Sequence, residues 1–132
     1  MKKFLLLGIF FSIVQFASAQ PTSDFVDDAP YNYEEVEVRP EFPGGYSEFM
    51  KFIGKNFVMP DYDGNGGSIK ISFIIELSGV ISNVVIIKDL GSGTGAEGKR
   101  VISMSPPWIP GELRGKKVRV IYELPIKIAN QN

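Results

Sequence analysis

The strongest constraint on the fold is an alternating apolar pattern near the C-terminal end of the chain. From Val118 to Ile128 an apolar side chain fills every second position, and Arg119, Glu123 and Lys127 fall between them. This period of two is typical of a strand with one buried face, and the segment would span roughly 36 Å. Pro125 has no N–H for a ladder bond, so the strand is predicted to lie at a sheet edge or a bulge. An edge strand is a place where another chain can dock.

The first 19 residues have the pattern of a secretory signal. Lys2-Lys3 precedes an apolar run, and Ala17-Ser18-Ala19 offers small residues before Gln20. We therefore expect residues 1–19 to be cleaved as a signal peptide. The alternative is an uncleaved membrane anchor, but the run is shorter than the roughly 20 apolar residues of a span. The chain contains no Cys, which argues against a disulfide scaffold or a lipidated Cys after the signal.

Charge and proline content set the next expectations. Cleavage would remove Lys2-Lys3 and change the formal net charge from −1 to −3, which argues against a nucleic-acid binder. Residues 20–40 are acidic, poor in aliphatic side chains and interrupted by prolines. We expect an extended acidic arm that contributes little to the core and acts as a tether. The alternative is that the arm folds back on the basic stretch at residues 114–119.

Residues 41–132 are expected to form the folded domain. After Pro43-Gly44-Gly45, apolar side chains at intervals of three and four predict an amphipathic helix with a buried stripe of Tyr46, Phe49, Met50, Ile53 and Phe57. Residues 68–77 alternate, Ser78-Gly79 can form a tight turn, and residues 80–88 read as a second strand. The apolar run Val84 to Ile87 places this second strand in the centre of the predicted sheet.

Asp61 to Gly66 matches the opening of a calcium-binding loop. The twelfth position of such a loop should supply a bidentate Glu, and here it is Ser72, inside a predicted strand. A glycine-rich turn into the sheet is therefore the favoured interpretation, and no metal site is expected.

Gly93 to Gly98 spells G-x-G-x-x-G, the pattern of dinucleotide-binding loops. That site requires a parallel βαβ unit, whereas the preceding strand here is one arm of a hairpin. The favoured alternative is a capping box of Thr94 and Glu97 that begins a short helix ending at Met104. Val101, Ile102 and Met104 would then face the core, and no cofactor is expected.

The remaining signals complete the predicted topology. Pro106-Pro107 stops the second helix, Trp108 is large enough to cover one end of the sheet, and Pro110-Gly111 turns the chain into the last strand. The order is helix, strand, strand, helix, strand. We predict an α+β fold with a small three-stranded antiparallel sheet and two helices packed on one face.

Several motifs in this order resemble the TonB C-terminal domain in the form common in Bacteroidetes. They are Arg39 to Gly45, Pro107 to Gly111, Arg114 to Val120 and Leu124 to Ile126, and the resemblance covers residues 36–128. It implies a periplasmic protein-binding domain whose exposed strand adds to the TonB box of an outer-membrane receptor. This mode of binding is β-augmentation, and it serves transmembrane transport of iron chelates, vitamins or glycans.

The chain departs from the pattern of energy-transducing relatives at two places. Those proteins have an uncleaved anchor and a long Pro- and Lys-rich spacer, whereas here residues 20–40 reach only about 70 Å when fully extended. Residues 91–98 are also richer in glycine than the acidic helix start usual in the family. A stand-alone exported domain is therefore favoured over a membrane-anchored energy transducer.

The predicted partner is a protein segment: either part of a TonB-dependent receptor or another copy of this chain. The expected contact residues, whose side chains point away from the core face, are Lys117, Arg119, Ile121 and Glu123. They could equally be solvated edge residues. A membrane partner is expected only if residues 1–19 are retained. An enzyme of the cell envelope is the less favoured class, because the chain has no His or Cys to act as base, nucleophile or metal ligand.

Overall fold

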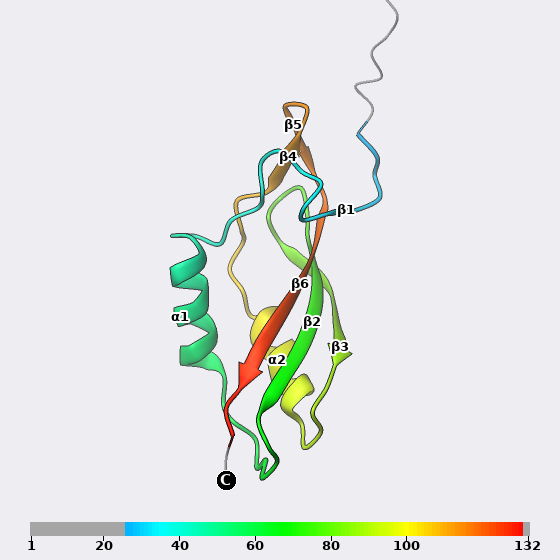
Figure 1. Ribbon diagram of the computed structural model, residues 1–132. Coiled ribbons are helices and arrows are strands. Elements are labelled where there is room, and N and C mark those ends of the chain that lie inside the picture. The colour runs from blue at the N-terminus through cyan, green and yellow to red at the C-terminus, as the bar shows by residue number, and fades with distance from the viewer. Residues whose placement is uncertain (1–25, 131–132) are drawn as a thin grey trace, which may run out of the picture.

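The computed structural model describes residues 26–130, so the predicted signal peptide and the first residues of the arm lie outside it. Figure 1 shows an elongated arrangement in which a long, twisted sheet carries both helices and a small hairpin projects from one end. The elements are β1 (Tyr31–Asn32), α1 (Tyr46–Asn56), β2 (Gly67–Ile75), β3 (Ile81–Lys88), α2 (Thr94–Ser103), β4 (Gly111–Leu113), β5 (Lys116–Val118) and β6 (Val120–Ile128).

The main sheet has four strands in the order β1-β6-β2-β3. β2 pairs antiparallel with both neighbours, whereas β1 pairs parallel with the start of β6. The α+β class and the two helices are confirmed, but a purely antiparallel sheet of three strands is wrong. The fourth strand comes from the N-terminal arm, and β4 and β5 form a separate hairpin.

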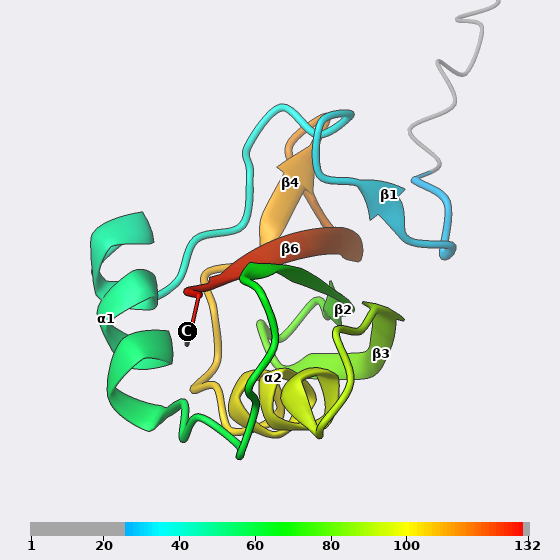
Figure 2. The same cartoon turned by 60° about the horizontal axis from the view of Figure 1, so that its bottom comes forward.

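One face of β2 carries the main core, and both helices contribute to it. Ile69, Ile71, Phe73 and Ile75 are fully buried on β2, and they cluster with side chains of α1 and α2. Figure 2 shows α2 across the face of the sheet and α1 to one side of it. The helical side chains in this cluster are Phe49 and Ile53 of α1 and Val101 and Ile102 of α2.

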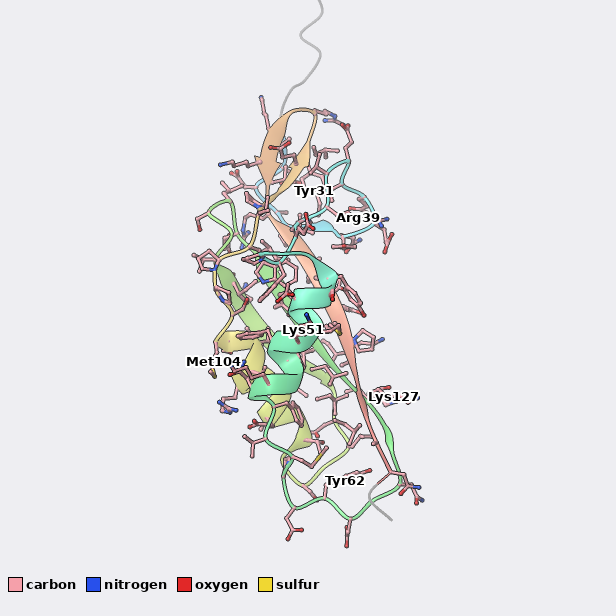
Figure 3. The ribbon with its side chains drawn as sticks, turned by 90° about the vertical axis from the view of Figure 1, so that its left-hand side faces the viewer. Tyr31, Arg39, Lys51, Tyr62, Met104 and Lys127 are labelled. Carbon is pink, nitrogen blue, oxygen red and sulfur yellow. The ribbon has the colours of Figure 1, made fainter. Side chains whose placement is uncertain are left out.

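Two predicted core residues are instead exposed. Tyr46 is 67% exposed at the first position of α1, and Met104 is 50% exposed just after α2, where its side chain projects outward (Figure 3). Both lie at helix termini, where the apolar stripe has already turned away from the sheet.

The predicted C-terminal strand is divided at Arg119 into β5 and β6. Arg114 and Gly115, with φ angles of 52° and 73°, form the tight turn between β4 and β5. The predicted alternation is confirmed on both sides of the break, because Val118, Val120, Leu124 and Ile128 are buried.

β3 lies at an edge of the sheet, so its predicted central position is wrong. Val85 and Ile87 are about half exposed, at 49% and 52%. α2 packs against this strand on one face only, which leaves alternate side chains of the apolar run uncovered. A continuous apolar run does not distinguish a central strand from an edge strand covered by a helix.

The G-x-G-x-x-G segment serves close packing of α2 against the sheet. A Cβ atom on Gly98 would lie 2.7 Å from Ile69 Cδ1, and one on Gly95 would lie 2.7 Å from Asp89 Cγ. Side chains at these positions would therefore hold the helix away from the core.

The predicted capping box is wrong, because Thr94 does not cap the helix. Its hydroxyl instead donates to Asp89 Oδ1 (3.0 Å), which also accepts from the backbone N–H groups of Gly91 (2.9 Å) and Gly95 (3.0 Å). These hydrogen bonds lower the pKa of Asp89, and the one from the Gly91 N–H has the largest effect. Glu97 accepts from the Val58 N–H instead, which ties the end of α1 to α2.

The arm was expected to be a tether, and over residues 26–40 it instead folds back on the domain. β1 pairs with β6, and Val36 is buried in a second small core with Val118 and Val120. Further along, Val38 exchanges backbone hydrogen bonds with Glu112. Burial of Val36 and pairing of β1 with β6 hold the arm against the domain, although its acidic composition predicted no such contacts. Within residues 26–130 no helix is long and apolar enough to cross a membrane.

Candidate docking edge on β6

The outer side of β6 is an open strand edge for most of its length. β6 and β2 pair in continuous register from Ile75 opposite Val120 to Gly67 opposite Ile128. On the other side, the N–H groups of Tyr31 and Tyr33 donate to the carbonyls of Arg119 (2.9 Å) and Ile121 (3.1 Å). β1 therefore covers only the beginning of β6.

Successive residues of a strand turn their backbone N–H and C=O groups to opposite sides, and this alternation identifies the groups of β6 that point outward beyond β1. Arg119 and Ile121 turn their carbonyls toward β1, so Glu123, Pro125 and Lys127 turn their backbone groups the same way. Within residues 26–130 these three residues have no strand partner on that side. We call this segment, residues 123–127, the open edge.

Pro125 lies where its missing N–H removes no bond to β2. Its backbone faces the outer side of β6, so the ladder with Lys70 on β2 stays intact. The prediction that Pro125 marks a sheet edge is confirmed. A partner strand would find a carbonyl but no N–H at this position.

The four predicted contact residues do not form one surface. Lys117 belongs to β5, where it pairs with Glu112 of the hairpin. Ile121 is level with Asn32, and its outward carbonyl is occupied by Tyr33. Glu123 lies on the open edge, with an exposed side chain 4.0 Å from Lys70 Nζ. Glu123 is thus the one of the four that is placed to meet an added strand.

Arg119 stabilises the fold by a paired contact with Glu76. Its Nε and Nη2 donate to the two carboxylate oxygens of Glu76 at 2.7 and 3.1 Å, and Nη1 donates to the Asp28 carbonyl at 3.1 Å. Ser82 Oγ also donates to Glu76, at 2.5 Å. The hydrogen bond from Arg119, followed by the one from Ser82, lowers the pKa of Glu76. This side chain therefore joins the arm, the β2–β3 turn and the start of β6.

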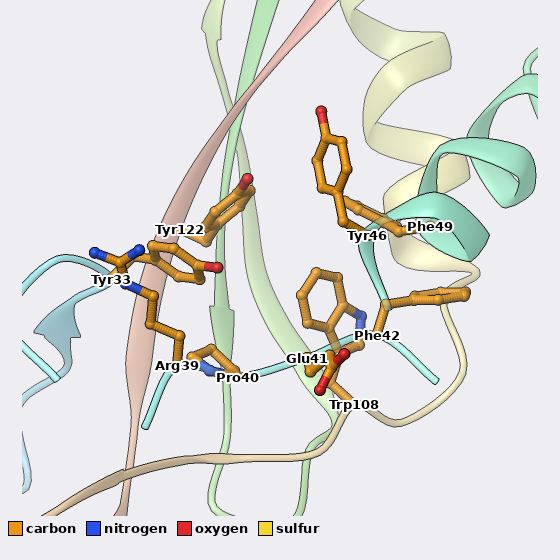
Figure 4. A pocket seen from close by; sticks show the side chains of 9 residues that line it. All are labelled: Tyr33, Arg39, Pro40, Glu41, Phe42, Tyr46, Phe49, Trp108 and Tyr122. Carbon is orange, nitrogen blue, oxygen red and sulfur yellow. The ribbon is translucent and has the colours of Figure 1, made fainter. Parts of the chain in front are cut away.

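An aromatic cavity of about 260 Å³ lies beside the open edge, on the side of the sheet that carries the helices. Figure 4 shows the rings of Tyr33 and Tyr122 on one side and those of Tyr46, Phe49 and Trp108 on the other. The lining residues are Tyr33, Arg39, Pro40, Glu41, Phe42, Tyr46, Phe49, Trp108 and Tyr122.

Packing among the rings fixes the walls of this aromatic cavity. Tyr33 meets Tyr122 edge to face with centroids 4.6 Å apart, and Phe49 meets Trp108 at 4.8 Å. Trp108 is 6% exposed and also contacts Phe73 of β2, so its predicted role of covering one end of the sheet is confirmed. Burial raises the pKa of the Tyr122 phenol above its ordinary value.

Sequence reasoning missed this cavity. It assigned Tyr46 to the buried stripe of α1 and treated Tyr33 as part of a tether. The sequence signal that could have placed Tyr46 at the start of the helix, away from its buried face, is the Gly44-Gly45 pair directly before it. In the structure these glycines have φ angles of 86° and 92° and turn the chain into the helix.

A second hollow, of about 290 Å³, lies on the opposite face of β6, where β1 ends. It is lined by Asn32, Tyr33, Glu34, Ile121 and Glu123. The open edge therefore begins between two hollows, one on each face of the sheet. Side chains of an added strand would alternate between these two faces.

The described residues contain no group of three His, Cys, Asp or Glu side chains that could hold a metal ion. In the calcium-loop-like segment, the Tyr62 hydroxyl donates to the Asn65 carbonyl at 2.5 Å, within the loop that leads into β2. The search for known relatives found no match to a family model, to a curated protein or to a solved structure.

Proposed function

We propose that this chain is a protein-binding module of the TonB C-terminal type, and that it binds an extended segment of a partner by adding it to the open edge of β6. The observation that carries the proposal is the regular register of β6 combined with outward backbone groups at residues 123–127. Main-chain hydrogen bonds would supply affinity without a fixed partner sequence, and the flanking hollows would receive alternate side chains.

The proposed partner is the TonB box of an outer-membrane receptor, and the proposed location is the periplasm. The support is the resemblance of residues 36–128 to the TonB C-terminal domain, together with an α+β fold that ends in β6, a strand whose outer side β1 covers only at its start. A second copy of the chain is the alternative occupant, since the same edge could pair with itself. Analytical ultracentrifugation over a range of concentrations separates the two.

The alternative function is a membrane-anchored energy transducer that keeps residues 1–19. The arm favours the stand-alone module, because residues 31–38 are held against β6 and the β4–β5 hairpin and so shorten any spacer. The intact mass of the protein from its native envelope decides between them. A mass that begins at Gln20 supports the module, and a mass that includes Lys2-Lys3 supports the transducer.

Glu123→Pro tests the docking edge directly. The substitution removes the outward N–H nearest the cavity and leaves the ladder to β2 intact, because that N–H does not face β2. We expect peptides with the sequence of receptor TonB boxes to lose at least about tenfold in affinity, measured by calorimetry. Glu123→Ala is the matched control, since it removes the same side chain but keeps the N–H, and it should bind nearly as well as the wild type.

Amide exchange locates the binding site independently of affinity. When a TonB-box peptide binds, the amides of Glu123 and Lys127 should become protected from exchange, while those of β3 should not change. Protection confined to β3, or equal affinity for the proline and alanine variants, would refute docking at β6.

A further inference from the structure

Main-chain pairing at the open edge would not by itself require an aromatic cavity beside β6. We propose that this cavity is a recognition pocket for one apolar side chain of the incoming strand, with a preference for an aromatic ring, and that it sets the register of that strand on β6. This inference rests on the proposed strand addition and adds a specificity determinant to it.

The register of β1 indicates where such a side chain would enter. Tyr31 is level with Val120 and Asn32 with Ile121, so Tyr33 comes level with Tyr122. Its ring packs edge to face on Tyr122, on the face that carries the helices. The chain itself thus already places an aromatic side chain at the first inward position beside the cavity.

A partner strand would continue the line that β1 leaves. The chain turns away after Tyr33, where the Glu35 N–H donates to the Asn32 carbonyl at 2.9 Å. The next inward position on an added strand would be level with Leu124, because side chains on one face recur every second residue. That side chain would lie beyond Tyr33, beside Tyr122 and on the face where Tyr46 stands.

The size of the cavity suits a side chain better than a free small molecule. Small-molecule sites usually enclose about 300 to 1,000 Å³, and this cavity encloses about 260 Å³. It is open at Tyr46, whose exposed ring contributes little to the core. The exposed Tyr46 ring adds apolar surface at the mouth of the cavity, and a bound aromatic side chain would cover it.

The chemistry of the walls favours an uncharged occupant. Arg39 already stacks over Tyr33, 5.0 Å from the ring centroid, and pairs with Glu34 at 2.5 Å. A second cation would therefore meet the Arg39 guanidinium at the wall. An acidic side chain would meet Glu41 and lose its hydration against the rings. An aromatic side chain gains edge-to-face contacts with Tyr122 and Trp108 at no such cost.

The test uses a capped peptide of alternating Thr and Val with one inward position occupied in turn by Phe, Leu, Ala or Glu. Trp108 is the sole tryptophan of the chain and forms part of the cavity wall, so its fluorescence reports occupation of the pocket. We expect the Phe peptide to bind about tenfold more tightly than the Ala peptide, and the Glu peptide to bind most weakly.

A double-mutant cycle combines Tyr46→Ala in the protein with the change from Phe to Ala in the peptide. Tyr46→Ala should weaken binding of the Phe peptide about fivefold and leave binding of the Ala peptide unchanged, whereas Tyr46→Phe should restore the preference. Leu77→Ala removes a comparably exposed apolar side chain in the β2–β3 turn and should change neither affinity. Circular dichroism confirms that each variant is folded.

The outcomes separate the pocket from the edge. Equal affinity for the Phe and Ala peptides, with both still weakened by Glu123→Pro, would overturn the pocket and leave strand addition standing. A Phe peptide that binds Glu123→Pro as tightly as it binds Glu123→Ala would overturn strand addition and with it the role of the pocket in register. Absence of binding by all four peptides and by TonB-box peptides would overturn both.

Discussion

Two strands of the sheet have an uncovered outer side, β3 along its length and β6 beyond the two residues that pair with β1, and they differ in how regularly they pair with β2. β6 pairs with β2 without interruption from Val120 to Ile128. β3 pairs with the other side of β2 through two register irregularities, next to Lys70 and between Ser72 and Ile74. Asn83 within β3 has a φ angle of 48°, in the left-handed region that non-glycine residues seldom adopt.

This difference indicates which edge can accept another strand. Irregular pairing and a left-handed residue bend a strand and break the even spacing of its outward groups, which is how many proteins protect an edge from association. β6 keeps the even spacing, and Pro125 is its one interruption. The exposed apolar side chains Val85 and Ile87 on β3 therefore do not by themselves make that edge a docking site.

Trp108→Ala gives the largest expected effect on stability. It tests whether the region beside β6 depends on the aromatic cluster around Trp108. The indole packs against Phe42, Phe49, Phe73 and Tyr122. Its removal should lower the free energy of unfolding by about 3–5 kcal/mol, because a large buried ring is replaced by a cavity. Urea unfolding followed by circular dichroism measures this loss. Val85→Ala on β3 is the control, with an expected change of about 0.5 kcal/mol or less. Similar losses of unfolding free energy for Trp108→Ala and Val85→Ala would contradict the proposed difference between the β6 and β3 sides of the sheet.

Glu76→Gln gives a smaller effect that depends on pH, and it tests the carboxylate that contacts residues next to both edges. Glu76 accepts from Arg119 beside β6 and from Ser82 of β3. Its pKa in the folded protein lies below the ordinary 4.5, chiefly because Arg119 donates to the carboxylate. The stabilisation is therefore complete above the unfolded pKa and is lost as pH falls through the folded value.

The measurement is the difference in unfolding free energy between wild type and Glu76→Gln from pH 7 down to pH 3. The wild type should be the more stable at neutral pH, and the difference should shrink toward zero in acid. A constant difference over that range would mean that the charge of Glu76 contributes nothing to the contact.

Much of this fold follows from local patterns in the sequence. The alternation in β2 and β6 and the helical spacing of Phe49 and Ile53 each specify which side chains are buried, because burial on one face imposes a fixed period. Pro125 indicated an edge for a simple chemical reason, the missing N–H.

What could not be predicted depends on contacts between distant segments. β1 consists of two residues, and its pairing with β6 depends on Val36 reaching Val118 and Val120, which no local pattern reveals. The cavity joins the arm, the start of α1, the loop before β4 and β6, so its residues become neighbours only in the fold. The order of strands was predicted incorrectly for the same reason: the apolar run of β3 does not specify what lies beside it.

Ile87→Lys is the smallest expected effect and the sharpest test of the β3 edge. The side chain is half exposed, so a charge there should change the free energy of unfolding by no more than about 0.5 kcal/mol. Binding of the Phe peptide should also be unchanged, since a lysine on β3 lies across the sheet from the open edge of β6. If a partner used β3 instead, the added charge would oppose pairing at that edge, as lysines on natural edge strands do, and affinity would fall while stability stayed constant. A loss of binding with Ile87→Lys and none with Glu123→Pro would therefore move the docking site to β3.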